Sequence, residues 1–221
     1  MGLLDNPWVL AGWLGAVVIS LMVVARDLRV HNPEIMPLMR LVWVLTVLYS
    51  GPLGLAIYSW SGRKQIRRDD LWRRGARSTA HCYAGCGLGE MVGLVIAVGL
   101  LALAPLWVAL TTFALAYAFG FGFTVGPLVQ EGMGVRQALA DAFWTESASI
   151  TVMEVVAIGV DLWLAGAATM GDVRFWTSLA VSLTAGFVAA YWVNVLLVHW
   201  GVKEGMHDPR EVAAHAHGHA A

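Results

Sequence analysis

Charged residues and cysteine are both scarce in this 221-residue sequence. Only 13% of the residues are Asp, Glu, Lys or Arg, and 58% are hydrophobic, with a mean hydropathy of +0.67. Soluble domains carry about 25% charged residues, so the composition excludes an ordinary soluble domain. Nucleic-acid binding would need such a folded soluble domain, so it is not expected. We therefore expect the lipid bilayer, and no nucleic acid, as a partner.

Recognisable catalytic patterns are also missing. The sequence shows no nucleophile, base and orienting group in a recognisable arrangement, and no cofactor fingerprint. An enzyme is therefore not the expected class, and binding or transport of a small solute is favoured.

Six apolar segments are long enough to cross a hydrocarbon core of about 30 Å. The first has no basic stretch before it and no small-residue cleavage site after it, so it is interpreted as an uncleaved span. The sequence predicts an all-α fold, a polytopic membrane helix bundle with about six transmembrane helices. The segments cover approximately Trp8–Ala25, Leu38–Trp60, His81–Leu103, Leu106–Val129, Ala148–Leu164 and Phe175–Trp200.

Two breaks shape these segments. Ser50-Gly51-Pro52 lies inside the second, where proline removes a backbone hydrogen bond and should kink the helix. Ala104-Pro105 separates the third from the fourth by a tight turn, so those two helices should form an antiparallel hairpin.

Positive charge is unevenly distributed along the chain. Because Lys and Arg in short loops mark the cytoplasmic side, the basic loop 61–78 should be cytoplasmic. Six crossings then place both termini in the cytoplasm and leave Arg26, Arg29 and Arg40 outside. The basic residues of the loop are Arg63, Lys64, Arg67, Arg68, Arg73, Arg74 and Arg77.

This distribution predicts a multi-pass protein of the cell inner (plasma) membrane with four parts. They are two N-terminal transmembrane helices (1–60), the basic cytoplasmic loop (61–78), a four-helix membrane core (79–200) and a His-rich C-terminal tail (201–221).

Both cysteines lie at the start of the third segment. Cys82, Cys86 and Glu90 recur at every fourth position and form one stripe along a helix face. Two cysteines four apart on a helix have Cβ atoms about 5–6 Å apart, whereas a disulfide needs roughly 3.5–4.5 Å. Free thiols or metal ligands are therefore favoured. His81 joins the thiols only if the helix begins there.

Acidic residues also occur within the fifth segment. Glu154 is surrounded by apolar residues, and Asp161 follows on nearly the same face. A carboxylate in hydrocarbon costs on the order of 2.5–3.5 kcal/mol, so such a group should face the bundle interior and be paired, protonated or functional. Asp161 has the alternative of being solvated at the membrane interface. Asn194 in the last segment is interpreted either as a hydrogen-bonding link between helices or as a functional group.

The third to sixth segments resemble a known family. From about Arg77 to Trp200 the sequence is similar to small bacterial membrane proteins that are grouped as a domain of unknown function and often catalogued, provisionally, as copper oxidases. The family has a methionine-glutamate element, here Met153 and Glu154, and an asparagine in its last span, here Asn194. Its His-Cys, Gly-Cys and Gly-acid pattern falls on His81, Cys82, Gly85, Cys86, Gly89 and Glu90.

The sequence departs from this family at one place. After the glutamate the family continues with an Asp-Asn pair, where this chain has Ala157 and Ile158, and Asp161 is the nearest acid that could substitute. The resemblance implies a membrane protein connected with copper. The multiple His-rich clusters of a blue-copper oxidase are absent from the sequence, so oxidase chemistry is not predicted.

The favoured hypothesis is a membrane protein that binds and transports a soft metal ion, copper(I). A small ion is its expected partner, and copper is its expected cofactor. Soft thiolates suit Cu(I), so His81, Cys82 and Cys86 are the predicted ligands. Glu90, Glu154 and Asp161 would carry protons or compensate charge. Met91, Met153 and Asn194 would support the site, and His215, His217 and His219 would chelate weakly in the tail. A metallochaperone or a second copy of the chain is a possible partner.

Two alternatives remain open. In the first, Cys82 and Cys86 form a membrane thiol redox pair, which a position at a helix N-terminus would favour. In the second, the chain is a proton-coupled transporter in which the cysteines are small buried hydrophobes and the membrane carboxylates carry the function.

Overall fold

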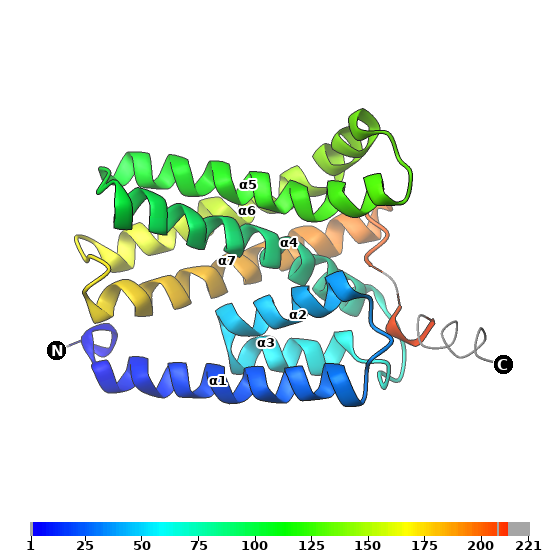
Figure 1. Cartoon of the computed structure of the whole chain (residues 1–221), viewed down its shortest axis with the longest axis horizontal. Coiled ribbons are helices and arrows are strands. Elements are labelled where there is room, and N and C mark those ends of the chain that lie inside the picture. Colours follow the sequence, from blue (N-terminus) through cyan, green and yellow to red (C-terminus); the bar gives the residue numbers. More distant parts are fainter. Residues whose placement is uncertain (1, 207, 212–221) are drawn as a thin grey trace.

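The computed structural model describes residues 2–206 and 208–211. Helices aligned along a common direction form a single bundle (Figure 1). Five of them are long and apolar enough to cross a membrane, which confirms the predicted polytopic all-α bundle. They are α1 (Pro7–Val30), α4 (Leu71–Leu94), α5 (Pro105–Gln130), α6 (Val135–Ala165) and α7 (Val173–His199).

The second predicted span does not cross the bundle. α2 (Pro37–Ser50) ends before Gly51, whose φ of +53° is in the region that glycine adopts most readily. α3 (Pro52–Ile57) and the π-helical turn η2 (Tyr58–Gly62) then run back along α2 (Figure 1). A Cβ on Gly62 would lie 2.4 Å from the Trp43 ring, which two parts of one continuous helix could not achieve. The predicted kink is therefore a reversal, and the segment is a re-entrant hairpin.

Five crossings place the two ends of the described chain at opposite ends of the bundle. Thr177, near the start of α7, donates a hydrogen bond to the Leu4 carbonyl at 2.8 Å. The segment that follows α7 instead contacts the start of α4, where Arg74 donates to the Glu204 carbonyl. The expectation that both termini share one side required six crossings, and the re-entrant hairpin removes one of them.

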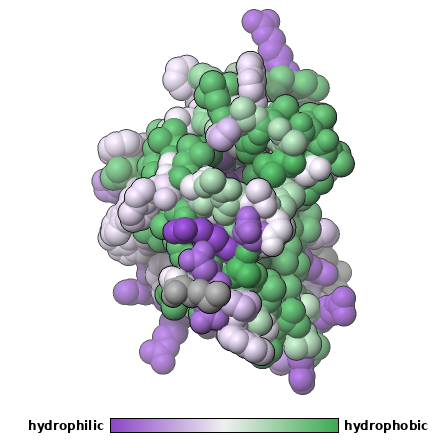
Figure 2. Space-filling model, turned by 90° about the vertical axis from the view of Figure 1, so that its left-hand side faces the viewer, coloured by the Kyte–Doolittle hydropathy of each residue, from purple (hydrophilic) through white to green (hydrophobic). Residues whose placement is uncertain are grey.

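Basic residues are concentrated at one end of the bundle. We call this the basic end: it contains the C-terminal part of α1, loop 63–70, the α5–α6 turn and the segment after α7. Every Lys and Arg of the sequence except Arg174 belongs to these segments or to the helix turns next to them, including Arg26, Arg29 and Arg40. The opposite, distal end is shown in Figure 2, where hydrophilic side chains gather near the middle and hydrophobic surface surrounds them.

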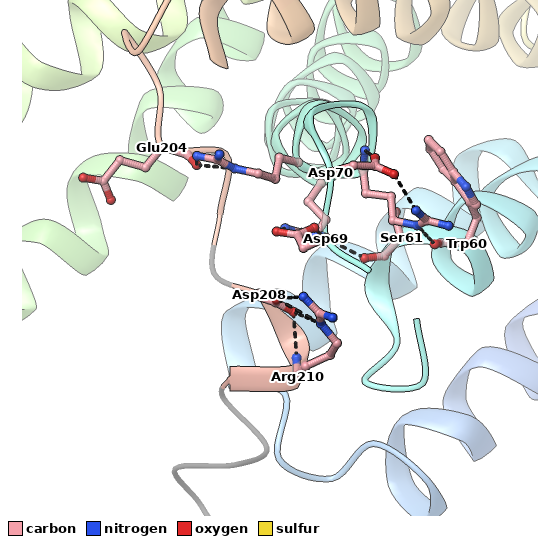
Figure 3. A network of polar contacts seen from close by, with 10 residues as sticks. Trp60, Ser61, Asp69, Asp70, Glu204, Asp208 and Arg210 are labelled. Atoms are coloured by element: carbon pink, nitrogen blue, oxygen red, sulfur yellow. Dashed lines mark hydrogen bonds and ion pairs between the residues drawn. The ribbon is translucent and has the colours of Figure 1, made fainter. Parts of the chain in front are cut away.

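Part of the predicted basic loop is helical. α4 begins at Leu71, with the Asp70 side chain accepting a hydrogen bond from the Arg73 backbone N–H as its N-cap. Arg77 is almost fully buried and donates two hydrogen bonds to Asp69, at 2.9 and 2.8 Å. Figure 3 shows Asp69 and Asp70, which form the ion pairs with Arg77 and Arg73, beside the segment after α7, which carries the Arg210–Asp208 pair.

Glycines allow α4 and α5 to approach closely. A Cβ on Gly85 would lie 2.9 Å from the Gly120 Cα, and one on Gly89 would lie 2.4 Å from the Leu115 carbonyl oxygen. Those atoms belong to the α5 backbone, which cannot move aside as a flexible side chain can. Small residues at such contacts let transmembrane helices pack backbone to backbone. α4 is thereby fixed against α5 along a face next to the stripe that carries the thiols. The predicted α4–α5 hairpin is confirmed, although π-helical η3 (Val95–Leu100) continues α4 before the turn.

We expect Gly89→Ala to destabilise the bundle by about 1–3 kcal/mol, because overpacking forces two backbones apart. Thermal unfolding of the purified protein in detergent measures the effect. Gly122→Ala is the matched control on α5, since a Cβ there meets nothing within 4 Å. Equal unfolding temperatures for the two variants would contradict the close α4–α5 contact.

Candidate functional site

The two thiols lie next to each other in the centre of the bundle. Cys82 and Cys86 are free and buried, and their Sγ atoms are 3.9 Å apart. A helix advances by 3.6 residues per turn, which places positions four apart on the same face. Ser149 of α6 donates a long hydrogen bond to the Cys82 Sγ at 3.7 Å. The thiol pair therefore lies between α4 and α6, with α5 close against Cys86 at Gly120.

His81 lies on a different face of α4 from the thiols. Its ring packs edge-on against Phe123 of α5, and its Nε2 is 3.5 Å from the Thr124 hydroxyl. Because α4 begins at Leu71, His81 belongs to a regular helix and points away from the Cys82 side chain. Within residues 2–206 and 208–211, no group of three or more His, Cys, Asp or Glu side chains could hold a metal ion. The described structure brings two of the predicted ligands together, and His81 stays apart.

The position of the thiols also bears on redox chemistry. Cys82 and Cys86 lie in the interior of α4, which starts at Leu71. The helix dipole acts within the first turn, so the helix-terminus argument for an activated thiol does not apply. The structure thus removes the feature that favoured a redox pair.

A buried ion pair lies beside the thiols at the basic end. The Lys203 ammonium donates to the Glu146 carboxylate at 2.7 Å, to the Asn194 side-chain oxygen at 2.7 Å and to the Ser149 hydroxyl at 3.3 Å. Ser78 of α4 donates to the same Asn194 oxygen at 3.1 Å. Only 5% of each charged side chain is exposed. This cluster joins α4, α6 and α7 through one cation.

Lys203 reaches this position because the chain reverses after α7. Gly201 has a φ of +72°, and the N–H groups of Val202 and Lys203 both donate to the Leu197 carbonyl, at 2.9 and 3.2 Å. Gly205, with a φ of +84°, packs against Arg74. Further along the same segment, hydrogen bonds from Arg210 lower the pKa of Asp208.

Two carboxylates lie deeper in the bundle. Glu90 and Glu154 are 4% and 1% exposed, and one oxygen of each is buried without a hydrogen-bond partner among the described residues. They interact electrostatically with each other, and Glu154 does so with Cys82. Asp161 accepts a hydrogen bond from Ser178 at 2.9 Å and interacts electrostatically with Glu90. The predicted acids therefore form one group that continues from the thiols.

The remaining predicted residues lie around this group. Met153 is buried in the core and Met91 packs at its margin. Asn194 belongs to the Lys203 cluster, so it links helices as one of its two interpretations predicted. Ala157 packs close to where a Cβ on Gly186 would lie, 3.1 Å away. His215, His217 and His219 lie outside the described residues.

Two cavities lie at opposite ends of this polar group. At the basic end a cavity of about 1210 Å³ is lined by Lys203, Glu146, Ser78 and Thr124 among others. At the distal end a cavity of about 690 Å³ is lined by Glu90 and Asp161 and by apolar residues of η3 and α5. We call the series of side chains between the cavities the polar path: Lys203, Glu146, Ser149, Cys82, Cys86, Glu154, Glu90 and Asp161.

This arrangement defines a polytopic membrane protein whose polar groups are gathered inside the bundle, between two cavities. The sequence pattern of one family matches residues 71–203, which is more than half of the chain, and the chain belongs to that family, the domain of unknown function DUF4396. The match covers α4 to α7 and ends at Lys203. No curated protein and no solved structure matches the sequence.

Sequence reasoning did not identify Lys203 or Glu146 as site residues. Glu146 precedes the predicted fifth span, and Lys203 follows the predicted sixth, so neither was expected inside a membrane span. The available signal was Gly201 and Gly205 on either side of Lys203, since paired glycines mark a chain reversal.

We expect Lys203→Ala to destabilise the protein by about 3–5 kcal/mol, because it leaves the Glu146 carboxylate buried and unpaired. Lys64→Ala is the matched control: it removes the other lysine, whose 2.8 Å pair with Glu34 is more exposed, at a cost of about 0–1 kcal/mol. Thermal unfolding in detergent compares the two. A Lys203→Ala protein as stable as the control would show that the pair is not buried in the membrane-bound protein.

Proposed function

We propose that this protein transports a soft cation, copper(I), along the polar path, with Cys82 and Cys86 as its binding site. The observation that carries the proposal is the position of two free thiols, in contact with each other, between two cavities at opposite ends of a membrane bundle. Soft thiolates select Cu(I) among the common metal ions. Copper is the substrate in this proposal, and no catalysis is assigned to it.

The thiol geometry suits one shared ion. Metal–thiolate bonds of about 2.3 Å, the length found for zinc, separate two sulfur atoms by ~3.8 Å at a tetrahedral angle and ~4.6 Å on a straight line. The observed 3.9 Å between the Cys82 and Cys86 Sγ atoms lies inside this interval. Two thiolates suffice as the ligands of Cu(I) here, so His81 is not required. Met91 and Met153 are the thioethers that could assist.

Charge balance gives the carboxylates a role in this proposal. A cation and two thiolates carry a net negative charge, and binding releases the thiol protons. Glu154 and Glu90, which follow the thiols along the polar path, would accept and pass those protons toward the distal cavity. Movement of the cation would then be coupled to movement of the thiol protons.

A proton-coupled transporter with structural cysteines is the second candidate. The buried, unpartnered oxygens of Glu90 and Glu154 favour it, since they need no metal to explain them. Measurements of uptake into proteoliposomes distinguish this candidate function from the first. If replacing both cysteines by alanine leaves uptake of the true substrate intact while Glu90→Gln or Glu154→Gln abolishes it, the thiols are structural.

We also infer the orientation in the membrane. The positive-inside rule assigns the basic end to the cytoplasm, because nearly all Lys and Arg residues lie there. Five crossings then put the N-terminal end of the chain on the outside of the inner membrane. Arg26, Arg29 and Arg40, which six crossings would have left outside, now agree with the rule. A copper chaperone in the cytoplasm would meet the basic end.

We expect purified protein to retain about one copper ion per chain under reducing conditions, and Cys82→Ser/Cys86→Ser to lose it, because serine is a poor ligand for Cu(I). Elemental mass spectrometry of the detergent-purified protein measures the ratio. His215, His217 and His219 are replaced by alanine in both proteins so that the tail contributes no metal. Copper absent from both, or retained by the double variant, would refute the thiol site.

We expect a thiol reagent that cannot cross membranes to label Leu3→Cys in intact cells, and Arg68→Cys only after permeabilisation. Leu3 and Arg68 have highly exposed side chains at the distal and basic ends. Both substitutions are made in the Cys82→Ser/Cys86→Ser protein, so that each variant has one thiol. The reverse pattern would invert the orientation, and labelling of both in intact cells would contradict five crossings.

A further inference from the structure

The Lys203 ammonium occupies a site that has the composition of a cation site. Its three partners are the Glu146 carboxylate, the Asn194 amide oxygen and the Ser149 hydroxyl, at 2.7, 2.7 and 3.3 Å. Carboxylate, carbonyl and hydroxyl oxygens are the ligands that hard cations prefer. The three come from α6 and α7, whereas Lys203 comes from the segment after α7. The oxygens are thus held by the bundle, and the cation is supplied by a tether.

This site lies between the basic-end cavity and the thiols. Lys203 and Glu146 line the basic-end cavity. The Ser149 hydroxyl lies within hydrogen-bond reach of both the Lys203 ammonium and the Cys82 sulfur, at 3.3 and 3.7 Å. A cation that moved between the cavity and the thiols past Ser149 would meet the Lys203 ammonium, whose charge would repel it.

The tether is built so that it can be displaced without unfolding a helix. Lys203 lies between Gly201 and Gly205, both at positive φ, and outside any helix. The segment is held to α4 by the hydrogen bond from Arg74 to the Glu204 carbonyl. Withdrawal of Lys203 would break the contacts of its ammonium and leave the oxygen site open within the bundle.

We propose that the oxygen atoms of Glu146, Ser149 and Asn194 form a second cation site at the mouth of the polar path. In this closed structure the Lys203 ammonium fills the site, and a passing cation exchanges with this ammonium. The proposal rests on the proposed function in that cations use the path. In this proposal Lys203 is a tethered cation, and Glu146 is the fixed counter-ion beside which one cation replaces the other.

Charge-selective labelling of Cys82 tests the proposal. The full chain carries Cys86→Ser, so that Cys82 is its single thiol. Its rates of modification by a trimethylammonium-ethyl methanethiosulfonate and by neutral methyl methanethiosulfonate are compared. The ratio of the cationic to the neutral rate reports the charge at the mouth of the path, while opening of the protein changes both rates together.

Lys203→Met keeps most of the side-chain volume and leaves the Glu146 charge, so the ratio should rise about tenfold or more. Glu146→Gln leaves the ammonium uncompensated, so the ratio should fall by a similar factor. The double variant Lys203→Met/Glu146→Gln should return close to the parent ratio. Lys64→Met, at the other lysine, should leave the ratio unchanged, since its pair with Glu34 is not part of the path.

Opposite shifts in the two single variants would support the exchange site, because a structural disturbance would alter both in the same direction. A rise of both rates with a constant ratio would show that Lys203 is a steric plug and would overturn the proposal. If one single variant does not fold, the direction in which the rate ratio changes in the other variant supports or overturns the proposal. Copper plays no part in this assay, so failure of the thiol site and failure of the exchange site are distinguishable.

Discussion

The ion pair between Lys203 and Glu146 is the interaction on which the arrangement of the site depends. Both side chains are 5% exposed, and burying one charge without the other would cost several kcal/mol. The pair can form only if the segment after α7 turns back into the bundle and if α6 presents Glu146 to it. It therefore fixes the segment after α7 against α6 at Glu146 and, through Asn194 and Ser78, against α4.

Much of the fold follows from the sequence because hydrocarbon imposes simple rules. Each long apolar segment must become a helix, since lipid offers no partner for backbone polar groups, and the five crossing helices are found where hydropathy predicts them. The stripe of Cys82, Cys86 and Glu90 follows from helical periodicity alone. Placing a carboxylate in hydrocarbon costs free energy, which predicts that Glu90 and Glu154 face the bundle interior. The structure buries both side chains.

The remaining features depend on chain reversals that periodicity does not encode. Gly51 followed by proline is compatible with a kink or with a hairpin, and the packing of Gly62 against Trp43 shows that the chain forms a hairpin. The hairpin reduces the number of crossing helices from six to five, so the two ends of the described chain no longer lie on the same side. Lys203 was missed for the same reason: a lysine beyond a span appears solvated unless the turn after it is known. The role of His81 depended on where α4 begins, a helix boundary that sequence patterns locate poorly.

The polar path is electrically asymmetric, and this asymmetry bears on its direction of use. At the basic end a carboxylate is matched by an ammonium, so the site is close to neutral until Lys203 leaves. At the distal end Glu90 and Glu154 have no such cation among the described residues. In the transport that we propose, a cation arriving from the distal cavity would meet the side-chain oxygens of Glu90 and Glu154 before the thiols. A cation arriving from the basic end would instead meet the Lys203 ammonium first, so passage at that end would require exchange at Glu146.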